Sequence, residues 1–303
     1  MKLSFWVKLI PQTVTGGMTM KKVAVFFILA CLLTAGCGED QKADPIYSQE
    51  ETLVQGESDE ETSLAPHTGA LASAQLGELD TKQVTWGPGR EVDELNRPTA
   101  CVSLQEQYGK YDAVFLTDQE GIWLTFDEGY ENGYTASILD TLKEEEVPAV
   151  FFVTLDYVKK EPDLVRRMID EGHTVGNHTA YHPNMTKITL EKAQENIQVL
   201  HDYMQEEFQY TMTLFRNPEG AFSEQVLALT QSMGYKTVLW SYAYKDWDVK
   251  QQPDPQTALK NVTHGLHPGA VYLLHAVSST NDQILKSFIE QARAEGYEFV
   301  QMQ

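Results

Sequence analysis

The stretch GIWLTFDEGY, residues 121–130, decides the fold, because an apolar run ending in two adjacent carboxylates predicts a β-strand with Asp127 and Glu128 at its carboxyl end. About fifty residues further on, the run HTAYH contains His178 and His182. Two neutral imidazoles and one carboxylate can hold a divalent ion with an open position, where bound water is acidified. A second carboxylate beside it can accept the water proton. The two runs together predict a metal site and a base.

From about Thr81 onward, short β-rich runs alternate with longer amphipathic stretches. The strand candidates are residues 121–127, 149–154, 174–177, 213–216, 237–243, 270–276 and 298–302. The helix candidates are residues 135–146, 162–171, 190–208, 224–233, 256–264 and 281–295, with Thr189 and Ser223 as N-caps and Gly172, Gly234 and Gly296 at the C-caps. Strands separated by helices predict an α/β fold, either a parallel barrel or an open doubly wound sheet.

The placement of polar residues favours the barrel. Five side chains each fall at or just past the end of a different strand candidate: Asp127, His178, Arg216, Asp246 and His275. A barrel gathers the carboxyl ends of many strands onto one rim, which explains this spread better than an open sheet does. We therefore predict a (β/α) barrel with seven parallel strands. A nucleotide site is unsupported, because no GxGxxG or GxxxxGK run opens a helix.

The first residues form a predicted targeting region, residues 1–37. Lys21 and Lys22 precede an apolar stretch, residues 23–33, which is too short to span a bilayer. The following run, LTAGC, resembles a bacterial lipoprotein cleavage site, which implies cleavage before Cys37 and lipid on its thiol. The alternative is an ordinary secretory signal with an incidental cysteine. Because residues 1–17 fit neither signal nor fold, we expect synthesis to begin at Met18 or Met20.

A predicted acidic tether, residues 38–80, separates this region from the folded domain, residues 81–303. Residues 38–66 hold nine acids against the single base Lys42 and have little to bury, which is typical of a solvated, extended segment. No disulfide framework is expected, because Cys101 has no partner once Cys37 carries lipid and Cys31 is removed. The formal net charge of -21 argues against nucleic acid as a partner, since a phosphate backbone needs a basic footprint.

Five runs occur in a fixed order: LTFDEGY, GNHTAYH, FRNPEG, YKDW and YLLH. In this order and spacing they resemble the motifs of the polysaccharide deacetylase family, also called the NodB homology domain or carbohydrate esterase family 4. The resemblance covers residues 86–303 and looks strongest to the branch that de-N-acetylates muramic acid in peptidoglycan. It implies a distorted (β/α) barrel and metal-dependent hydrolysis of an N-acetyl group on a polysaccharide amino sugar.

The resemblance also implies roles for individual residues. Asp127 matches the general base, and His178 and His182 match the metal-binding histidines. Arg216 and Asp246 match the charged residues that orient the catalytic groups, and His275 matches the general acid that protonates the leaving amine. We expect Arg216 to keep Asp127 ionised, and a carboxylate beside His275, such as Asp246, to keep that imidazole protonated.

Two residues depart from the family pattern. Glu128 stands where most members have the metal-binding aspartate, and its extra methylene moves the carboxylate oxygens outward. Glu219 stands where the muramic acid branch has a basic residue, so it would repel the lactyl carboxylate of N-acetylmuramic acid. Tyr181 and Trp247 are candidates for a sugar-stacking floor or for packing at the end of the barrel, and packing is the favoured role for Trp247.

The sequence therefore predicts a lipid-anchored monomer outside the bacterial cytoplasm that deacetylates N-acetylmuramic acid or N-acetylglucosamine of peptidoglycan. Zinc is the expected metal, and cobalt, nickel or manganese would suit the same ligands. Two alternatives stay open. One is an O-acetyl esterase acting on xylan or another glycan, and the other is a catalytically degenerate glycan-binding lipoprotein in which Glu128 has abolished metal binding.

Overall fold

Eight strands form one curled sheet, in the order β2-β8-β6-β5-β4-β3-β10-β9, and every neighbouring pair is parallel. The computed structural model of the chain describes residues 73–118 and 121–302. The strands are β2 (Ala113–Val114), β3 (Trp123–Glu128), β4 (Ala149–Val153), β5 (Thr174–Asn177), β6 (Leu214–Phe215), β8 (Lys236–Val238), β9 (Tyr242–Ala243) and β10 (Val271–His275). No strand pair joins β2 to β9 in the described part of the chain, so the predicted (β/α) barrel is confirmed in a distorted, incompletely closed form.

The longest strands lie at the centre of the sheet. Every residue of β3 and β4 is buried, which explains why the sequence there is a continuous apolar run rather than an alternating one. Phe126 and Phe151 stack across these two strands with their ring centroids 5.2 Å apart. The register pairs Asp127 with His275 on β10, so the carboxyl ends of two adjacent strands present these two residues side by side.

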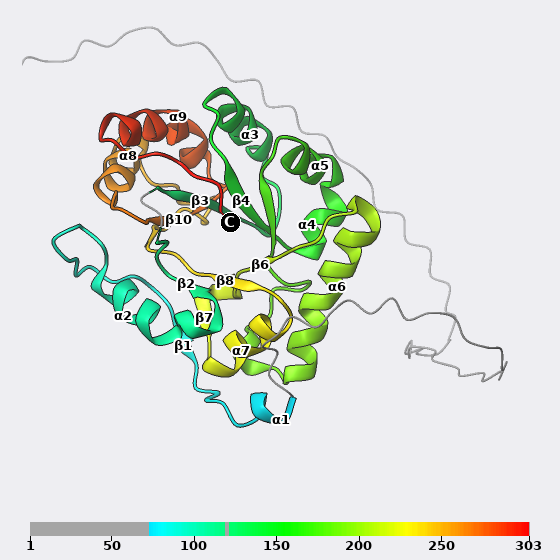
Figure 1. Cartoon of the computed structure of the whole chain (residues 1–303). Helices are drawn as coiled ribbons and strands as arrows, with labels where there is room; N and C mark the ends of the chain where they lie inside the picture. The colour runs from blue at the N-terminus through cyan, green and yellow to red at the C-terminus, as the bar shows by residue number, and fades with distance from the viewer. Residues whose placement is uncertain (1–72, 119–120, 303) are drawn as a thin grey trace, which may run out of the picture. The chain divides into compact units, whose positions relative to one another are not determined.

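Helices cover the outside of the sheet (Figure 1). They are α2 (Thr99–Tyr108), α3 (Thr135–Glu144), α4 (Leu155–Lys160), α5 (Pro162–Asp170), α6 (Leu190–Phe208), α7 (Glu224–Ser232), α8 (Pro255–His264) and α9 (Ser279–Ala294). The hydroxyls of Thr189 and Ser223 accept the backbone N–H groups of Lys192 and Val226, which confirms both predicted N-caps. The three predicted C-cap glycines have φ of +85°, +82° and +89°, a region that favours glycine: Gly172, Gly234 and Gly296.

The predicted strand at residues 237–243 is wrong in one respect, because its two ends belong to opposite parts of the sheet. The backbone N–H of Leu239 donates to Val114 at 2.8 Å, and that of Ser241 donates to Val271 at 2.9 Å. The segment therefore crosses between the two open ends of the sheet, with Trp240 buried between them. An apolar run predicts burial but not a crossing, which depends on partners far away in the sequence.

The sheet also differs from the prediction at its edges. Residues 298–302 contribute only an isolated bridge, between Phe299 and Ile122, and not a seventh strand. The short strand β2 and the helices α2 and α4 were not predicted. In α2 only Cys101 is fully buried, so that helix lacks the apolar stripe by which sequence reasoning recognises helices.

The described residues begin within the segment predicted to be a tether. Helix α1 (Ser73–Leu76) contributes the buried Leu76, and the Gln225 side chain donates to the Leu76 carbonyl at 2.9 Å. The end of the predicted tether thus packs on the folded domain. The predicted signal region, Cys37 and the remainder of the tether lie outside the described residues. Within the described ranges, no helix is both long enough and apolar enough to cross a bilayer.

A short antiparallel pair, β1 (Val84–Thr85) with β7 (Ala221–Phe222), forms a second sheet separate from the main one.

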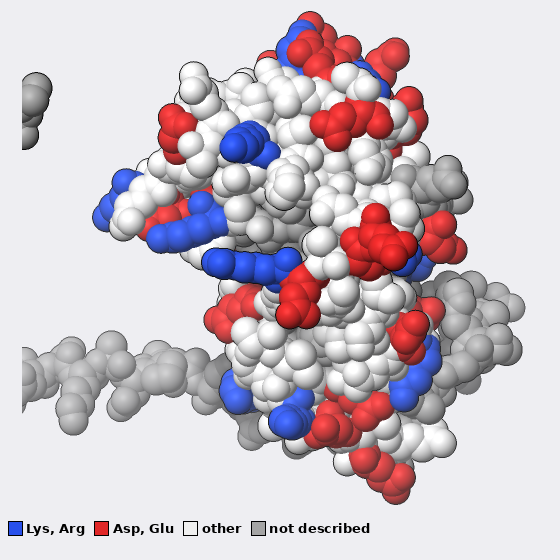
Figure 2. Space-filling model, turned by 90° about the vertical axis from the view of Figure 1, so that its left-hand side faces the viewer, with Lys and Arg blue, Asp and Glu red and all other residues white. Residues whose placement is uncertain are grey.

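On the face drawn in Figure 2, acidic and basic side chains are intermixed and form no continuous basic surface. The expectation from net charge, that nucleic acid is not a partner, stays a prediction.

Candidate active site

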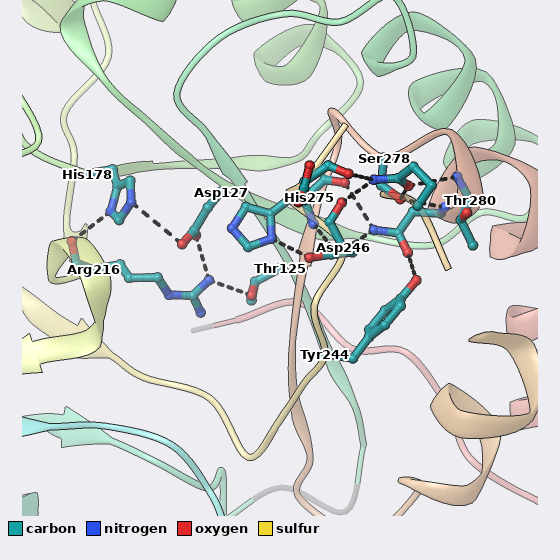
Figure 3. Close-up of polar contacts among 12 residues, drawn as sticks. Thr125, Asp127, His178, Arg216, Tyr244, Asp246, His275, Ser278 and Thr280 are labelled. Atoms are coloured by element: carbon teal, nitrogen blue, oxygen red, sulfur yellow. Dashed lines mark hydrogen bonds and ion pairs between the residues drawn. The ribbon is translucent and has the colours of Figure 1, made fainter. Parts of the chain in front are cut away.

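Five strand ends bring the predicted polar residues to one rim. Asp127 lies near the end of β3 and His275 ends β10, while His178 and Arg216 directly follow β5 and β6. Asp246 lies in the loop after β9. Figure 3 shows the five side chains in two neighbouring groups of polar contacts, one of His178, Asp127 and Arg216 and one of Asp246 and His275. The barrel prediction required this gathering of strand ends.

Arg216 and Asp127 form a buried ion pair. Nη1 of Arg216 donates to Asp127 Oδ1 and to Thr125 Oγ1, each at 2.8 Å. Nε and Nη2 donate to the carbonyls of Val238 and Leu239, and the guanidinium carbon lies 4.2 Å from the centroid of the Phe152 ring. Burial by itself would raise the pKa of Asp127, but the positive charge of Arg216 leaves that pKa below its ordinary value. The predicted contact is confirmed, and Asp127 is ionised at neutral pH.

His178 is held as a neutral imidazole with a free nitrogen. Its Nδ1 lies 2.9 Å from the Arg216 carbonyl, which accepts only from a protonated nitrogen, so Nε2 carries the lone pair. Nε2 faces Asp127, with a separation of 3.6 Å from Oδ2. Burial lowers the pKa of His178 to about 4. The His182 ring lies 4.8 Å from the His178 ring, centroid to centroid, so the structure brings the two predicted metal-binding histidines together.

Asp246 and His275 form the second charged pair. Nδ1 of His275 lies 2.7 Å from Asp246 Oδ1, and the backbone N–H of His275 donates to Oδ2 at 2.9 Å. Burial alone would lower the pKa of His275, but the hydrogen bond and charge of Asp246 raise it above its ordinary value. The pKa of Asp127 and the pKa of His275 are thus shifted in opposite directions, the pattern that a base and an acid in one site would need.

Glu128 does not join this group. Consecutive strand residues point to opposite faces, and Asp127 points toward Arg216 while Glu128 points toward α3. Thr135 at the start of α3 donates to Glu128 Oε1 at 3.5 Å, and Oε2 has no hydrogen-bond partner. Burial, together with the charges of Glu131 and Asp127, raises the pKa of Glu128 well above its ordinary value. The structure therefore does not bring the predicted third metal ligand to the histidine pair.

The residues that are present fit a divalent metal in part. His178 and His182 supply two imidazole donors, the ligand type that zinc and its neighbours favour. Among residues 73–118 and 121–302, no three His, Cys, Asp or Glu side chains converge closely enough to hold a metal. The histidine pair is the donor set, and Glu128 does not complete it in this arrangement.

Aromatic side chains border the rim. Among the described residues, the large aromatic side chains that are exposed are Tyr130, Tyr181 and Trp247, at 49%, 70% and 52%. Each lies within three residues of Asp127, His178 or Asp246 in the sequence. The Trp247 ring tilts toward His275 with 5.8 Å between centroids. The half-exposed Trp247 ring leaves both packing and sugar stacking as predictions, while Tyr130 was not predicted at all.

Glu219 lies on the loop that follows β6, in the 3-10 turn Pro218–Gly220. Its φ of +59° is a left-handed conformation, which is uncommon for a residue other than glycine. Its carboxylate accepts a hydrogen bond from Asn184 Nδ2 at 3.0 Å, two residues beyond His182. The predicted negative charge is therefore anchored beside the loop that carries the histidines.

Sequence reasoning missed three residues around the charged pairs. Thr125 accepts from Arg216, Asn281 donates to Asp246, and Tyr244 donates to Asn281. Thr125 could have been found, because it precedes Asp127 by two positions on a strand and so shares its face. Tyr244 lies in the run YKDW, two positions before Asp246, but its partner Asn281 carries no comparable signal, because it lies 35 residues beyond Asp246 on another element.

Comparison with known proteins identifies the family. Residues 116–238 match the polysaccharide deacetylase family. The chain is 40% identical, over 233 residues, to the peptidoglycan-N-acetylmuramic acid deacetylase PdaA of Bacillus subtilis, covering 76% of this chain and 88% of that protein. It is 34% identical over 179 residues to the peptidoglycan-N-acetylglucosamine deacetylase PgdA of Listeria monocytogenes, covering 59% of this chain and 37% of that protein.

The fold agrees with these similarities. The solved structure of Bacillus subtilis PdaA, a family 4 carbohydrate esterase, superposes with a TM-score of 0.69 at 39% identity, covering 74% of this chain and 96% of that one. With the five motifs gathered on one rim of a distorted barrel, the chain belongs to the polysaccharide deacetylase family and is a hydrolase of carbon–nitrogen bonds other than peptide bonds.

Proposed function

We propose that this protein is a metal-dependent N-deacetylase that removes acetyl groups from the amino sugars of peptidoglycan at the bacterial cell surface. The observation that carries the proposal is the pair of oppositely tuned groups on one rim. Arg216 holds the pKa of Asp127 below its ordinary value, and Asp246 raises the pKa of His275 above its own. The names of the relatives PdaA and PgdA support peptidoglycan as the polymer.

Amide hydrolysis requires a proton to leave the attacking water and a proton to reach the departing amine. Asp127 accepts the water proton through Oδ2, since Oδ1 is engaged by Arg216. His275 donates a proton through Nε2, since Nδ1 is bound to Asp246. Without that proton the amine would leave as an anion, which makes it a very poor leaving group.

His178 and His182 would hold the metal. When bound, a divalent ion supplies Lewis acidity that lowers the pKa of a water and polarises the acetyl carbonyl. The Nδ1 contact of His178 with the Arg216 carbonyl fixes the tautomer that leaves Nε2 available. Glu128 is not required for this role, because its carboxylate faces Thr135.

Release of acetate from purified peptidoglycan, with acetylated xylan as the competing ester substrate, tests the reaction. We expect acetate from peptidoglycan and none beyond background in the Asp127→Asn and His275→Ala variants. Activity on xylan alone would favour the esterase, and activity that survives both substitutions would end the proposal.

Metal content tests the donor set separately from the reaction. We expect the purified protein to bind one divalent ion, zinc in the first instance, that is lost in His182→Ala and retained in Glu128→Gln. Loss of the ion in Glu128→Gln would show that Glu128 turns toward the histidines. Failure to bind zinc, cobalt, nickel or manganese at any concentration would remove the metal from the proposal.

The location and the sugar are further parts of the proposal. The run LTAGC supports lipid attachment at Cys37 and residence outside the cytoplasm, and we propose a monomer there. The similarity to PdaA favours N-acetylmuramic acid, whereas the anchored negative charge of Glu219 favours N-acetylglucosamine, which has no lactyl carboxylate. Mass spectrometry of the glycan after digestion would identify which residue lost its acetyl group.

A further inference from the structure

The Asp246 carboxylate is held by more than its catalytic partner. His275 donates to both of its oxygens, and Asn281 Nδ2 donates to Oδ2 at 2.6 Å. The same Nδ2 group donates to the His275 carbonyl at 3.0 Å. Asn281 is therefore bonded to both members of the acid pair. It lies outside the five sequence motifs, in the first turn of α9.

The orientation of the Asn281 amide is itself determined by its surroundings. The Tyr244 hydroxyl donates to Asn281 Oδ1, a contact drawn in Figure 3, so the amide nitrogen must face Asp246. Turning the amide over would place Oδ1 against the carboxylate and the NH₂ group against a donor. Asn281 is 1% exposed, and its backbone N–H is bound to Ser278 Oγ at 3.0 Å, so the side chain has little freedom.

The spacing from β10 to α9 makes this arrangement compact. His275 ends the strand and Ser278 caps the helix by accepting from the Asn281 backbone N–H, so His275 and Asn281, six residues apart, both reach the Asp246 carboxylate.

We propose that Asn281 is a positioning residue of the acid, holding the Asp246 carboxylate against His275, and that Tyr244 fixes the amide that does so. This inference rests on the proposed function, in which His275 protonates the leaving amine. Without Asn281, Oδ2 keeps only the His275 backbone N–H, and the carboxylate can turn away from Nδ1. The imidazolium would then lose its counter-charge and release its proton at lower pH.

The charged and titratable groups around this pair are few. His275 faces Asp246, Asp127 and Arg216, and the phenols of Tyr242 and Tyr244 lie beside Asp246. Asp127 and Arg216 act on His275 with opposite signs and are bonded to each other, so Asp246 is the group on which the protonation of His275 depends.

Gln252 offers a matched control, because its side chain hydrogen-bonds to the backbone of the loop that carries Asp246 and not to the Asp246 carboxylate. Its Nε2 donates to the Asp246 carbonyl at 2.6 Å, and its Oε1 accepts from Ser278 Oγ at 2.5 Å. A Gln252→Ala variant removes these contacts to the loop and does not itself remove the hydrogen bond from Asn281 to the carboxylate.

The test is an NMR titration of the His275 imidazole in the full chain, assigned by loss of its signal in His275→Gln, together with the pH profile of acetate release. We expect Asn281→Leu to lower the pKa of His275 by about one unit. We also expect kcat to fall about tenfold with KM unchanged, the size of effect seen for residues that orient catalytic groups. Tyr244→Phe should shift the pKa in the same direction by less, and Gln252→Ala should not shift it.

An unchanged His275 pKa in a folded Asn281→Leu variant would overturn the proposal, as would an equal shift in Gln252→Ala. If Asn281→Leu does not fold, Tyr244→Phe decides the matter, since it removes a single hydroxyl. Failure of the proposed function has a different signature. In that case the expected pKa shifts would appear, but the wild-type protein would release no acetate from peptidoglycan.

Discussion

Replacing Arg216 with methionine tests whether the buried ion pair dominates the energetics of the rim. Arg216 is fully buried and uses four hydrogen bonds to satisfy two backbone carbonyls, Thr125 and Asp127. Methionine refills much of the volume but leaves the Asp127 carboxylate in a buried site without its counter-charge. Breaking a buried pair in this way costs about 3–5 kcal/mol. In a domain of this size, that cost corresponds to a fall in Tm of roughly 6–20 °C.

The assay is thermal and urea unfolding of four proteins: wild type, Arg216→Met, Asp127→Asn and the double variant. The double variant contains neither buried charge, so it should be more stable than the sum of the two single effects implies. We expect an interaction free energy of about 0.5–3 kcal/mol. Strictly additive effects, or an Arg216→Met variant as stable as wild type, would refute the assignment of Arg216 as the counter-charge of Asp127.

Three further outcomes are expected. In metal-free protein, the free energy of unfolding should fall by up to about 3 kcal/mol as pH drops from 6.5 to about 4. The reason is that His178 binds a proton in the unfolded chain but not in the folded protein. In a His178→Asn variant, the free energy of unfolding measured with urea should therefore depend less on pH. An equally steep pH dependence would contradict the burial argument. Substituting Glu219→Arg should improve kcat/KM for muramic acid substrates roughly fivefold, the scale of one exposed charge contact, with little change for N-acetylglucosamine oligomers; equal effects on both would exclude a role in sugar choice. Alanine at Tyr130, Tyr181 or Trp247 should raise KM for glycan oligomers while Tm stays within about 2 °C of wild type, because exposed rings contribute little packing; a large fall in Tm would identify packing instead.

Much of the fold follows from local pattern. Helix α6 was predicted with both ends correct, because a Thr189 cap precedes a long amphipathic run. Strands β3, β4, β5 and β10 were predicted within two residues, since their apolar runs are bounded by turns and end in polar side chains. The crossing at residues 239–241 was not predicted, because its hydrogen-bond partners are distant in the sequence. Leu239 bonds to Val114, more than a hundred residues earlier, and Ser241 bonds to Val271, about thirty residues later.

Most residues of the candidate site were also predicted from the sequence. Motif order identified Asp127, His178, Arg216, Asp246 and His275, and the structure brings all five to one rim. Glu128 was predicted as a metal ligand although it directly follows Asp127 on the same strand. Neighbours in a strand face opposite sides, and which side carries a given residue depends on how the strand packs.

By itself the sequence determined the alternation of strands and helices, the order of the chemical groups along the chain and the excess of negative charge. These follow from side-chain types and short-range periodicity, which each segment carries locally. The tertiary structure alone decided the charge state of each group and the residues that support it. A pKa depends on burial and on charges within a few ångströms, and Arg216, Asp127, Asp246, His275 and Asn281 become neighbours only when the sheet curls.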